Sequence, residues 1–190
     1  MGVWFNPKED YICRHYCPNA RFIQLRGIEP YFWQSPWSAA LKGKKVLVVH
    51  PFTESIKRQY SQARDHLYAD PDILPEFELL TVKAVQSLGQ RNVSAVWFKA
   101  LDSMKSQIEQ HNFDIALLGA GAYGLPLTAH IKRMGKMAIY TGGATQILFG
   151  IKGKRWENRP SFSKLFNSYW VSPLPAEVPE SVKTKNPDYW

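Results

Sequence analysis

The sequence predicts an α/β protein built on a mostly parallel sheet. Apolar strand-like segments alternate with helix-like segments between residues 45 and 149, and two glycine-rich turns each follow a strand. The 190 residues are 45% hydrophobic and 21% charged, which excludes a disordered chain and fits one domain. We expect residues 1–159 to form that domain, with residues 1–40 as an irregular aromatic-rich segment and residues 160–190 as an extended proline-rich tail.

The first strand, helix and second strand are predicted from periodicity. Residues 45–52 combine a basic start, an aliphatic run and a closing proline, which is typical of a buried strand. Residues 53–67 follow as a helix, with Thr53 or Ser55 as the candidate N-cap. One face of that helix is apolar at helical spacing: Ile56, Tyr60, Ala63 and Leu67. Residues 77–85 form the second predicted strand.

The second half of the domain repeats the alternation. A helix is predicted from a cap at Asn92 or Ser94 to residue 111, and a fully apolar strand follows at residues 113–118. After a glycine turn, Pro126 suits the first turn of a helix that ends at Gly135. A fourth strand at residues 136–140 and a short helix at 145–149 complete the pattern. Five prolines in the last 31 residues predict the extended tail.

The first glycine turn is the sharpest motif in the chain. Residues 119–124 read Gly-Ala-Gly-Ala-Tyr-Gly, which matches G-x-G-x-x-G between a predicted strand and a predicted helix. Such a turn lets backbone N–H groups approach a phosphate at a helix N-terminus. An NAD site would also need an acidic residue about 20 positions later, and residues 139–145 contain none. A tight turn without any ligand is the alternative interpretation.

A second glycine turn and a basic loop strengthen the phosphate-binding hypothesis. In parallel sheets ligands bind beyond the carboxyl ends of the strands, where both turns and the strand end at His50 are expected. The basic loop after the second turn suits phosphate oxygens, although a solvated surface loop explains it equally well. The expected phosphate-binding residues are Gly119, Gly121, Tyr123, Gly124, Gly142, Gly143, Thr145, Gln146, Lys152, Lys154 and Arg155. His50 and Glu29 are the candidates for a catalytic acid or base.

Charge and composition restrict the remaining classes of function. The formal net charge of +8 is spread along the chain, which favours a small anionic ligand over a nucleic acid. Cys13 and Cys17 lack the further ligands of a zinc site, so we expect a reduced pair, and no metal ligands can be named. Asp70-Pro71-Asp72 spells D-x-D but has the composition of a turn. No segment is predicted to span a membrane, and we expect a cytoplasmic protein.

The two glycine turns with their flanking helices resemble a group of bacterial proteins. Residues 119–135 and 142–156 look like the corresponding parts of GT-D-type glycosyltransferases, which occur in surface-polysaccharide gene clusters. Residues 43–52 are similar to the first core strand of that group. The resemblance covers about residues 26–156, and the second glycine turn is its most distinctive part.

The resemblance implies a Rossmann-like fold and transfer of a sugar from a nucleotide-sugar donor to a glycan acceptor. It also implies a divalent metal that accompanies the donor, held by an acidic D-x-E element. This chain contains no D-x-E triplet, which is a departure from the family pattern. Two alternatives therefore stay open. One is a non-catalytic nucleotide-binding or assembly component, and the other is a dinucleotide-dependent oxidoreductase.

Overall fold

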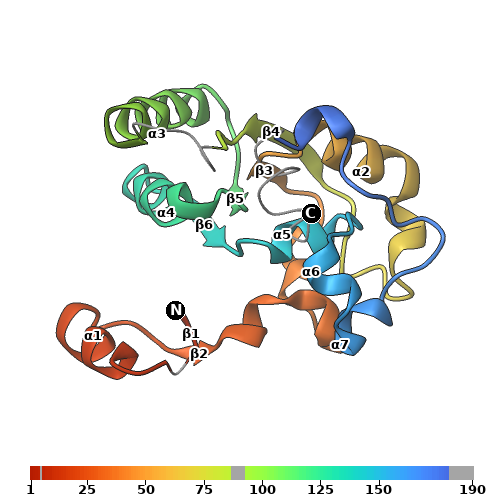
Figure 1. Ribbon diagram of the computed structural model, residues 1–190, viewed down its shortest axis with the longest axis horizontal. Helices are drawn as coiled ribbons and strands as arrows, with labels where there is room; N and C mark the ends of the chain where they lie inside the picture. Colours follow the sequence, from red (N-terminus) through yellow and green to blue (C-terminus); the bar gives the residue numbers. More distant parts are fainter. Residues whose placement is uncertain (5, 87–92, 180–190) are drawn as a thin grey trace.

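Four parallel strands form the central sheet of the protein (Figure 1). The structure is a computed structural model that describes residues 1–4, 6–86 and 93–179, without the side chains of residues 93–95. The spatial order of the strands is β4-β3-β5-β6, and each neighbouring pair is parallel. Their bounds are Lys45–His50 for β3, Glu78–Lys83 for β4, Ile115–Leu118 for β5 and Met137–Tyr140 for β6. The prediction of a Rossmann-like α/β fold is confirmed.

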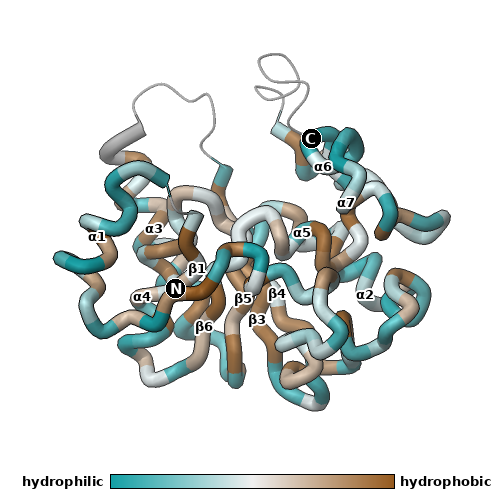
Figure 2. Tube along the Cα trace, turned by 90° about the horizontal axis from the view of Figure 1, so that it is seen from below, coloured by the Kyte–Doolittle hydropathy of each residue, from teal (hydrophilic) through white to brown (hydrophobic). Residues whose placement is uncertain are grey.

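Helices cover both faces of this sheet, as Figure 1 shows. One face packs beneath α2 (Thr53–Leu67), and the other packs beneath α3 (Val93–Glu109) and α4 (Gly124–Arg133). Alternation along the strands explains this, because Val46 and Val48 join the first core whereas Leu47 and Val49 join the second. All four valine and leucine side chains are fully buried. The tube in Figure 2 is correspondingly hydrophobic along the strands.

The strand order creates a switch point between β3 and β5. The chain leaves β3 through α2 toward β4, and it leaves β5 through α4 toward β6 on the other side. These two connections therefore diverge from neighbouring strands, which opens a crevice beyond their carboxyl ends. A short helix, η4 (Gly121–Tyr123), follows β5 there, and α5 (Ala144–Leu148) follows the turn after β6. Both glycine turns therefore lie at this edge of the sheet, where the sequence predicted them.

The described segment after residue 159 is folded onto the domain and is not the extended tail that the sequence predicted. Two short helices, α6 (Lys154–Glu157) and α7 (Pro160–Ser163), lead into a stretch that pairs Val171 with Ile151 and ends in η5 (Pro175–Glu177). Phe162 and Trp170 are buried in the core on the α2 side. The prolines were wrongly interpreted as a sign of extended chain. Pro160 starts a helix, and the aromatic residues between the prolines bury apolar surface. Residues 180–190 of the expected tail lie outside the described part.

The aromatic-rich segment 1–40 holds several short elements. A two-stranded parallel ladder joins β1 (Gly2–Val3) to β2 (Ile23–Gln24), with α1 (Glu9–Tyr16) between them. Three short helices then lead to the sheet: η1 (Leu25–Ile28), η2 (Pro30–Phe32) and η3 (Trp37–Leu41). Both cysteines in this segment are free thiols, as expected. Figure 1 shows α1, β1 and β2 set apart from α2, whereas Tyr31 and Leu41 join the core.

The start of α2 differs from the prediction. Neither Thr53 nor Ser55 caps the helix, because the N-cap residue is Phe52 and makes no side-chain hydrogen bond. A carboxylate from far along the chain, that of Glu177, accepts the N–H groups of Glu54 and Ser55 instead. The apolar stripe of α2 is as expected, with Ile56, Ala63 and Leu67 buried and Tyr60 half-buried. The predicted caps of α3, Asn92 and the side chain of Ser94, lie outside the described residues.

Candidate functional site

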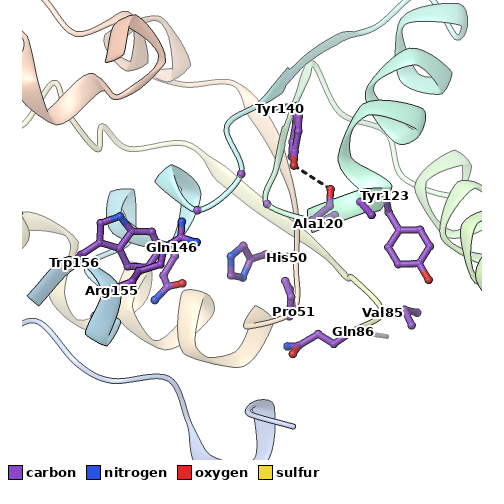
Figure 3. A pocket seen from close by; sticks show the side chains of 15 residues that line it. His50, Pro51, Val85, Gln86, Ala120, Tyr123, Tyr140, Gln146, Arg155 and Trp156 are labelled. Carbon is purple, nitrogen blue, oxygen red and sulfur yellow. Dashed lines mark hydrogen bonds between the residues drawn. The ribbon is translucent and has the colours of Figure 1, made fainter. Parts of the chain in front are cut away.

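A cavity of about 370 Å³ lies at the carboxyl edge of the sheet, over the switch point (Figure 3). Every strand of the sheet contributes to it through the residues at its end or just beyond. Its lining comprises His50, Pro51, Val85, Gln86, Gly119, Ala120, Gly121, Ala122, Tyr123, Tyr140, Gly142, Gly143, Gln146, Arg155 and Trp156. The wall therefore combines two glycine turns with one arginine, one histidine and several aromatic rings.

The first glycine turn packs directly against His50. A Cβ atom built on Gly119 would lie 2.3 Å from Cδ2 of His50 and 2.8 Å from the carbonyl oxygen of Gly142. No side chain fits there, so only glycine lets the ends of β3, β5 and β6 meet this closely. Gly142 itself has a φ of +56°, in the left-handed region. These two glycines thus let the strand ends approach closely at the wall of the cavity.

Arg155 lies over the second glycine turn. A Cβ atom on Gly143 would approach a terminal guanidinium nitrogen of Arg155 to 2.1 Å and the ring of Trp156 to 2.6 Å. The guanidinium carbon is 3.8 Å from the centroid of the Trp156 ring, which is a cation–π contact. Arg155 is half-buried and Trp156 is buried. The stack holds a planar cation against a backbone turn, in the arrangement that suits a phosphate or carboxylate.

Tyr140 connects the two glycine turns. Its hydroxyl donates to the carbonyl oxygen of Gly121 at 3.0 Å, which Figure 3 draws as a dashed line. Its ring lies against Gly124, where a Cβ atom would come within 2.1 Å of Cε2. This explains why the last glycine of the G-x-G-x-x-G motif is glycine. Gly124 allows α4 to pack closely against Tyr140 of β6. It is not among the residues that line the cavity.

His50 is held as a neutral hydrogen-bond donor. The backbone N–H of Phe52 donates to Nδ1 of His50 at 3.0 Å, so the single proton of the neutral ring is on Nε2. The side chain is 3% exposed, and burial lowers the pKa of His50 from 6.5 to about 3. A ring with this pKa and this tautomer is a poor proton acceptor at neutral pH. The geometry therefore favours donation from Nε2 over the role of general base that the sequence suggested.

The low pKa of His50 predicts acid sensitivity of the fold. Unfolding returns the pKa to about 6.5, so between pH 6.5 and 3 the unfolded chain binds the additional proton. The free energy of unfolding should therefore fall with acidification below pH 6.5, by up to about 1.4 kcal/mol per pH unit from this group. Urea denaturation at several pH values measures it. His50→Gln should flatten the slope over this range, and an unchanged slope in that variant would contradict the assignment.

Several residues expected from the sequence lie away from the cavity. Lys152 directs its Nζ toward the ring of Phe166, 5.9 Å from the centroid, and Lys154 is exposed. Thr145 is buried and hydrogen-bonds Thr141. Glu29 is half-buried outside the cavity lining, where burial raises its pKa against the opposing effects of Arg26 and Arg159. By contrast, the cavity brings together His50, Gly119, Gly121, Tyr123, Gly142, Gly143, Gln146 and Arg155.

Sequence reasoning missed part of the lining. Val85 and Gln86 come just after β4, so the rule that ligands bind beyond strand ends was the available signal for them. Tyr140, at the end of β6, had the same signal. No sequence signal identified Trp156, because its position depends on the packing of α6 against Gly143 at the start of α5. Its ring also packs against Gly153, which explains a glycine in the basic loop.

The residues described here do not fit a divalent metal. Among them no group of three or more His, Cys, Asp or Glu side chains is arranged to hold an ion. In the lining of the cavity His50 is the sole member of those four types. Asp70 and Asp72 form a turn, in which the Asp70 carboxylate accepts the N–H of Asp72 at 2.9 Å.

Comparison of the chain with protein-family models, with curated proteins and with solved structures gives no match. The resemblance to GT-D-type glycosyltransferases stays a hypothesis based on the sequence. Across the described ranges, none of the helices has both the length and the hydrophobicity needed to cross a bilayer.

Proposed function

We propose that the cavity binds the diphosphate of a nucleotide sugar and that the protein is a glycosyltransferase. The observation that carries the binding part is the placement of Arg155 over Gly143, opposite the donor nitrogen of His50 at the other glycine turn. A guanidinium, an imidazole N–H and the two glycine turns then surround one space. The N–H groups of Gly119 and Gly142 already donate to the carbonyl oxygens of Val49 and Leu118, so the guanidinium and the imidazole are the main donors. Anions with several oxygens, above all diphosphates, match this set of donors.

The transfer part of the proposal uses the same groups. The acceptor hydroxyl oxygen bonds to the anomeric carbon as the bond between the sugar and the diphosphate breaks. The nucleoside diphosphate leaves with the electron pair and gains negative charge, and the hydroxyl proton passes to it or to solvent. Arg155 would stabilise that charge, and fixed donors aimed at a developing charge are usually the largest contribution to such steps. His50 would donate from Nε2 to the same oxygens. The nucleotide-sugar donor and the glycan acceptor are the proposed partners.

One observation favours non-catalytic nucleotide binding as the second candidate. Among the described residues no carboxylate lines the cavity, so none is placed to accept a proton from an acceptor hydroxyl. A nucleotide-binding component would need the donors around the diphosphate and no such base. Both functions thus share one binding site and differ only in turnover.

Titration with nucleotides tests the binding part. We expect isothermal titration to detect UDP or GDP binding, with nucleoside monophosphates weaker because they lack the second phosphate. Incubation with a panel of nucleotide sugars, each with and without Mn²⁺, then separates the candidates. Release of nucleoside diphosphate together with a glycosylated product supports transfer, and binding without release supports the second candidate. Absence of any nucleoside diphosphate binding at low salt would overturn both.

The same titration addresses the dinucleotide alternative. An oxidoreductase of this type would bind NAD or NADP, and the acidic residue expected for the ribose is missing after the first glycine turn. We expect NADH binding to be weaker than UDP binding, measured by the change in nicotinamide fluorescence. Tight NADH binding would favour the oxidoreductase.

A further inference from the structure

Glu177 is a buried carboxylate bound to a helix more than a hundred residues away. It is 6% exposed, and its two oxygens accept the N–H groups of Glu54 at 2.8 Å and Ser55 at 3.1 Å. The hydroxyl of Ser55 also donates to it. Since α2 has Phe52 at its N-cap and no side-chain cap of its own, these bonds satisfy backbone donors that would otherwise be unpaired. A negative charge is also favourable at a helix N-terminus.

The stretch that carries Glu177, residues 172–179, also contacts the cavity wall. The N–H of Leu174 donates to the hydroxyl of Ser55 at 2.9 Å, so Ser55 links this stretch to α2 twice. The side-chain amide of Gln86, a cavity-lining residue, donates to the backbone oxygen of Glu177 at 3.2 Å. One short stretch therefore contacts both the first turn of α2 and Gln86, beyond the end of β4.

The first turn of α2 continues directly into the contact that orients His50. The first helical hydrogen bond runs from the N–H of Ile56 to the carbonyl oxygen of Phe52 at 2.9 Å. The N–H of the same Phe52 donates to Nδ1 of His50. The position of Phe52 thus depends on the start of the helix, and the tautomer of His50 depends on Phe52.

We propose that Glu177 is a positioning residue for the cavity: by holding the start of α2 it places the N–H of Phe52 on His50 and keeps the His50 proton on Nε2. This inference rests on the proposed function for the use of that proton, which is donation to a diphosphate. The arrangement itself concerns the free protein and is testable without any ligand. Glu177 touches no ligand in this scheme and acts through Phe52 and His50.

The experiment compares Glu177→Ala and Glu177→Gln with the matched control Glu157→Gln. Glu157 is an exposed glutamate at the end of α6, twenty residues before Glu177 in the sequence. Long-range ¹H–¹⁵N correlation of the histidine rings reports the tautomer, with His50 assigned through His50→Gln. We expect one tautomer, protonated at Nε2, in the wild type and in Glu157→Gln. We expect a mixture of both tautomers in Glu177→Ala and a smaller change in Glu177→Gln.

A merely structural role of Glu177 would lower the melting temperature without changing the tautomer. If folded Glu177→Ala and Glu177→Gln both retain the single Nε2–H tautomer, the inference is overturned. Should Glu177→Ala not fold, Glu177→Gln and Ser55→Ala decide in its place. We further expect UDP affinity to drop about fivefold in Glu177→Ala. A changed tautomer in a protein whose wild type binds no nucleoside diphosphate would support the positioning role and reject the proposed function.

Discussion

Replacing Arg155 by alanine is expected to weaken UDP binding at least about tenfold. The guanidinium lies over Gly143 and is the one arginine or lysine side chain that lines the described cavity. Loss of a charge-assisted hydrogen bond costs roughly 1.5–3 kcal/mol, which corresponds to at least about a tenfold change in dissociation constant. Isothermal titration at moderate salt measures this. We also expect a stability loss of about 0.5–1 kcal/mol, since the stack on Trp156 disappears.

Arg155→Lys distinguishes shape from charge at the same position. Lysine retains the positive charge but has neither the planar fork nor the same stacking on Trp156, so we expect most of the affinity loss to persist. Arg133→Ala is the matched control, because Arg133 is an exposed arginine at the end of α4, at the opposite edge of the sheet. Wild-type affinity in Arg155→Ala would remove the guanidinium from the site. An equal loss in Arg133→Ala would mean that only net charge matters.

Gly119→Ala is expected to destabilise the protein and to impair binding together. The added methyl group would lie 2.3 Å from the His50 ring and 2.8 Å from the backbone oxygen of Gly142, and the backbone cannot move aside cheaply. Inserting one carbon into such a tightly packed place costs about 1–3 kcal/mol. Because the methyl separates the two glycine turns and displaces the His50 donor, we also expect UDP affinity to fall about tenfold. Urea denaturation and isothermal titration measure the two effects.

Gly135→Ala is the control for the general cost of replacing a glycine in this protein. Gly135 follows α4 with a φ of +77°, and a Cβ atom there would have no neighbour within 4 Å. Alanine in the left-handed region costs roughly 1–2 kcal/mol, so stability should fall while UDP affinity stays the same. If Gly119→Ala leaves both stability and affinity unchanged, the close contact between the strand ends is not as described.

The local hydrophobic pattern of the sequence was sufficient to predict the strands of the sheet and most of its helices. A parallel strand buried on both faces is apolar throughout, and β5, which is fully buried, could therefore be recognised without knowledge of its neighbours. The stripe of α2 shows its helical period in the same way. Pattern failed after residue 159, where proline spacing suggested an extended chain. Phe162 and Trp170 are buried there against segments that precede them by many residues.

The two glycine turns also followed from sequence, because each lies between a predicted strand and a predicted helix, and the first matches G-x-G-x-x-G. The roles of their glycines did not. Gly119 makes room for His50, Gly124 for the ring of Tyr140 and Gly143 for Arg155 with Trp156, and each close approach joins residues from different elements. Among the basic residues of one loop, only the fold decided that Arg155 faces the cavity whereas Lys152 turns toward Phe166.

The sequence by itself determined the class of fold, the order of its elements and the edge of the sheet at which the cavity lies. These features depend on hydrophobic period and on the rule that neighbouring parallel strands end on the same side. The tertiary structure alone decided the tautomer of His50 and the partner that caps α2. The tautomer follows from the contact between the N–H of Phe52 and Nδ1 of His50, whose geometry the folded backbone sets. The cap joins Glu177 to Glu54 and Ser55 across more than a hundred residues. No local pattern encodes such a contact, since its energy arises only when distant segments bury the same polar groups together.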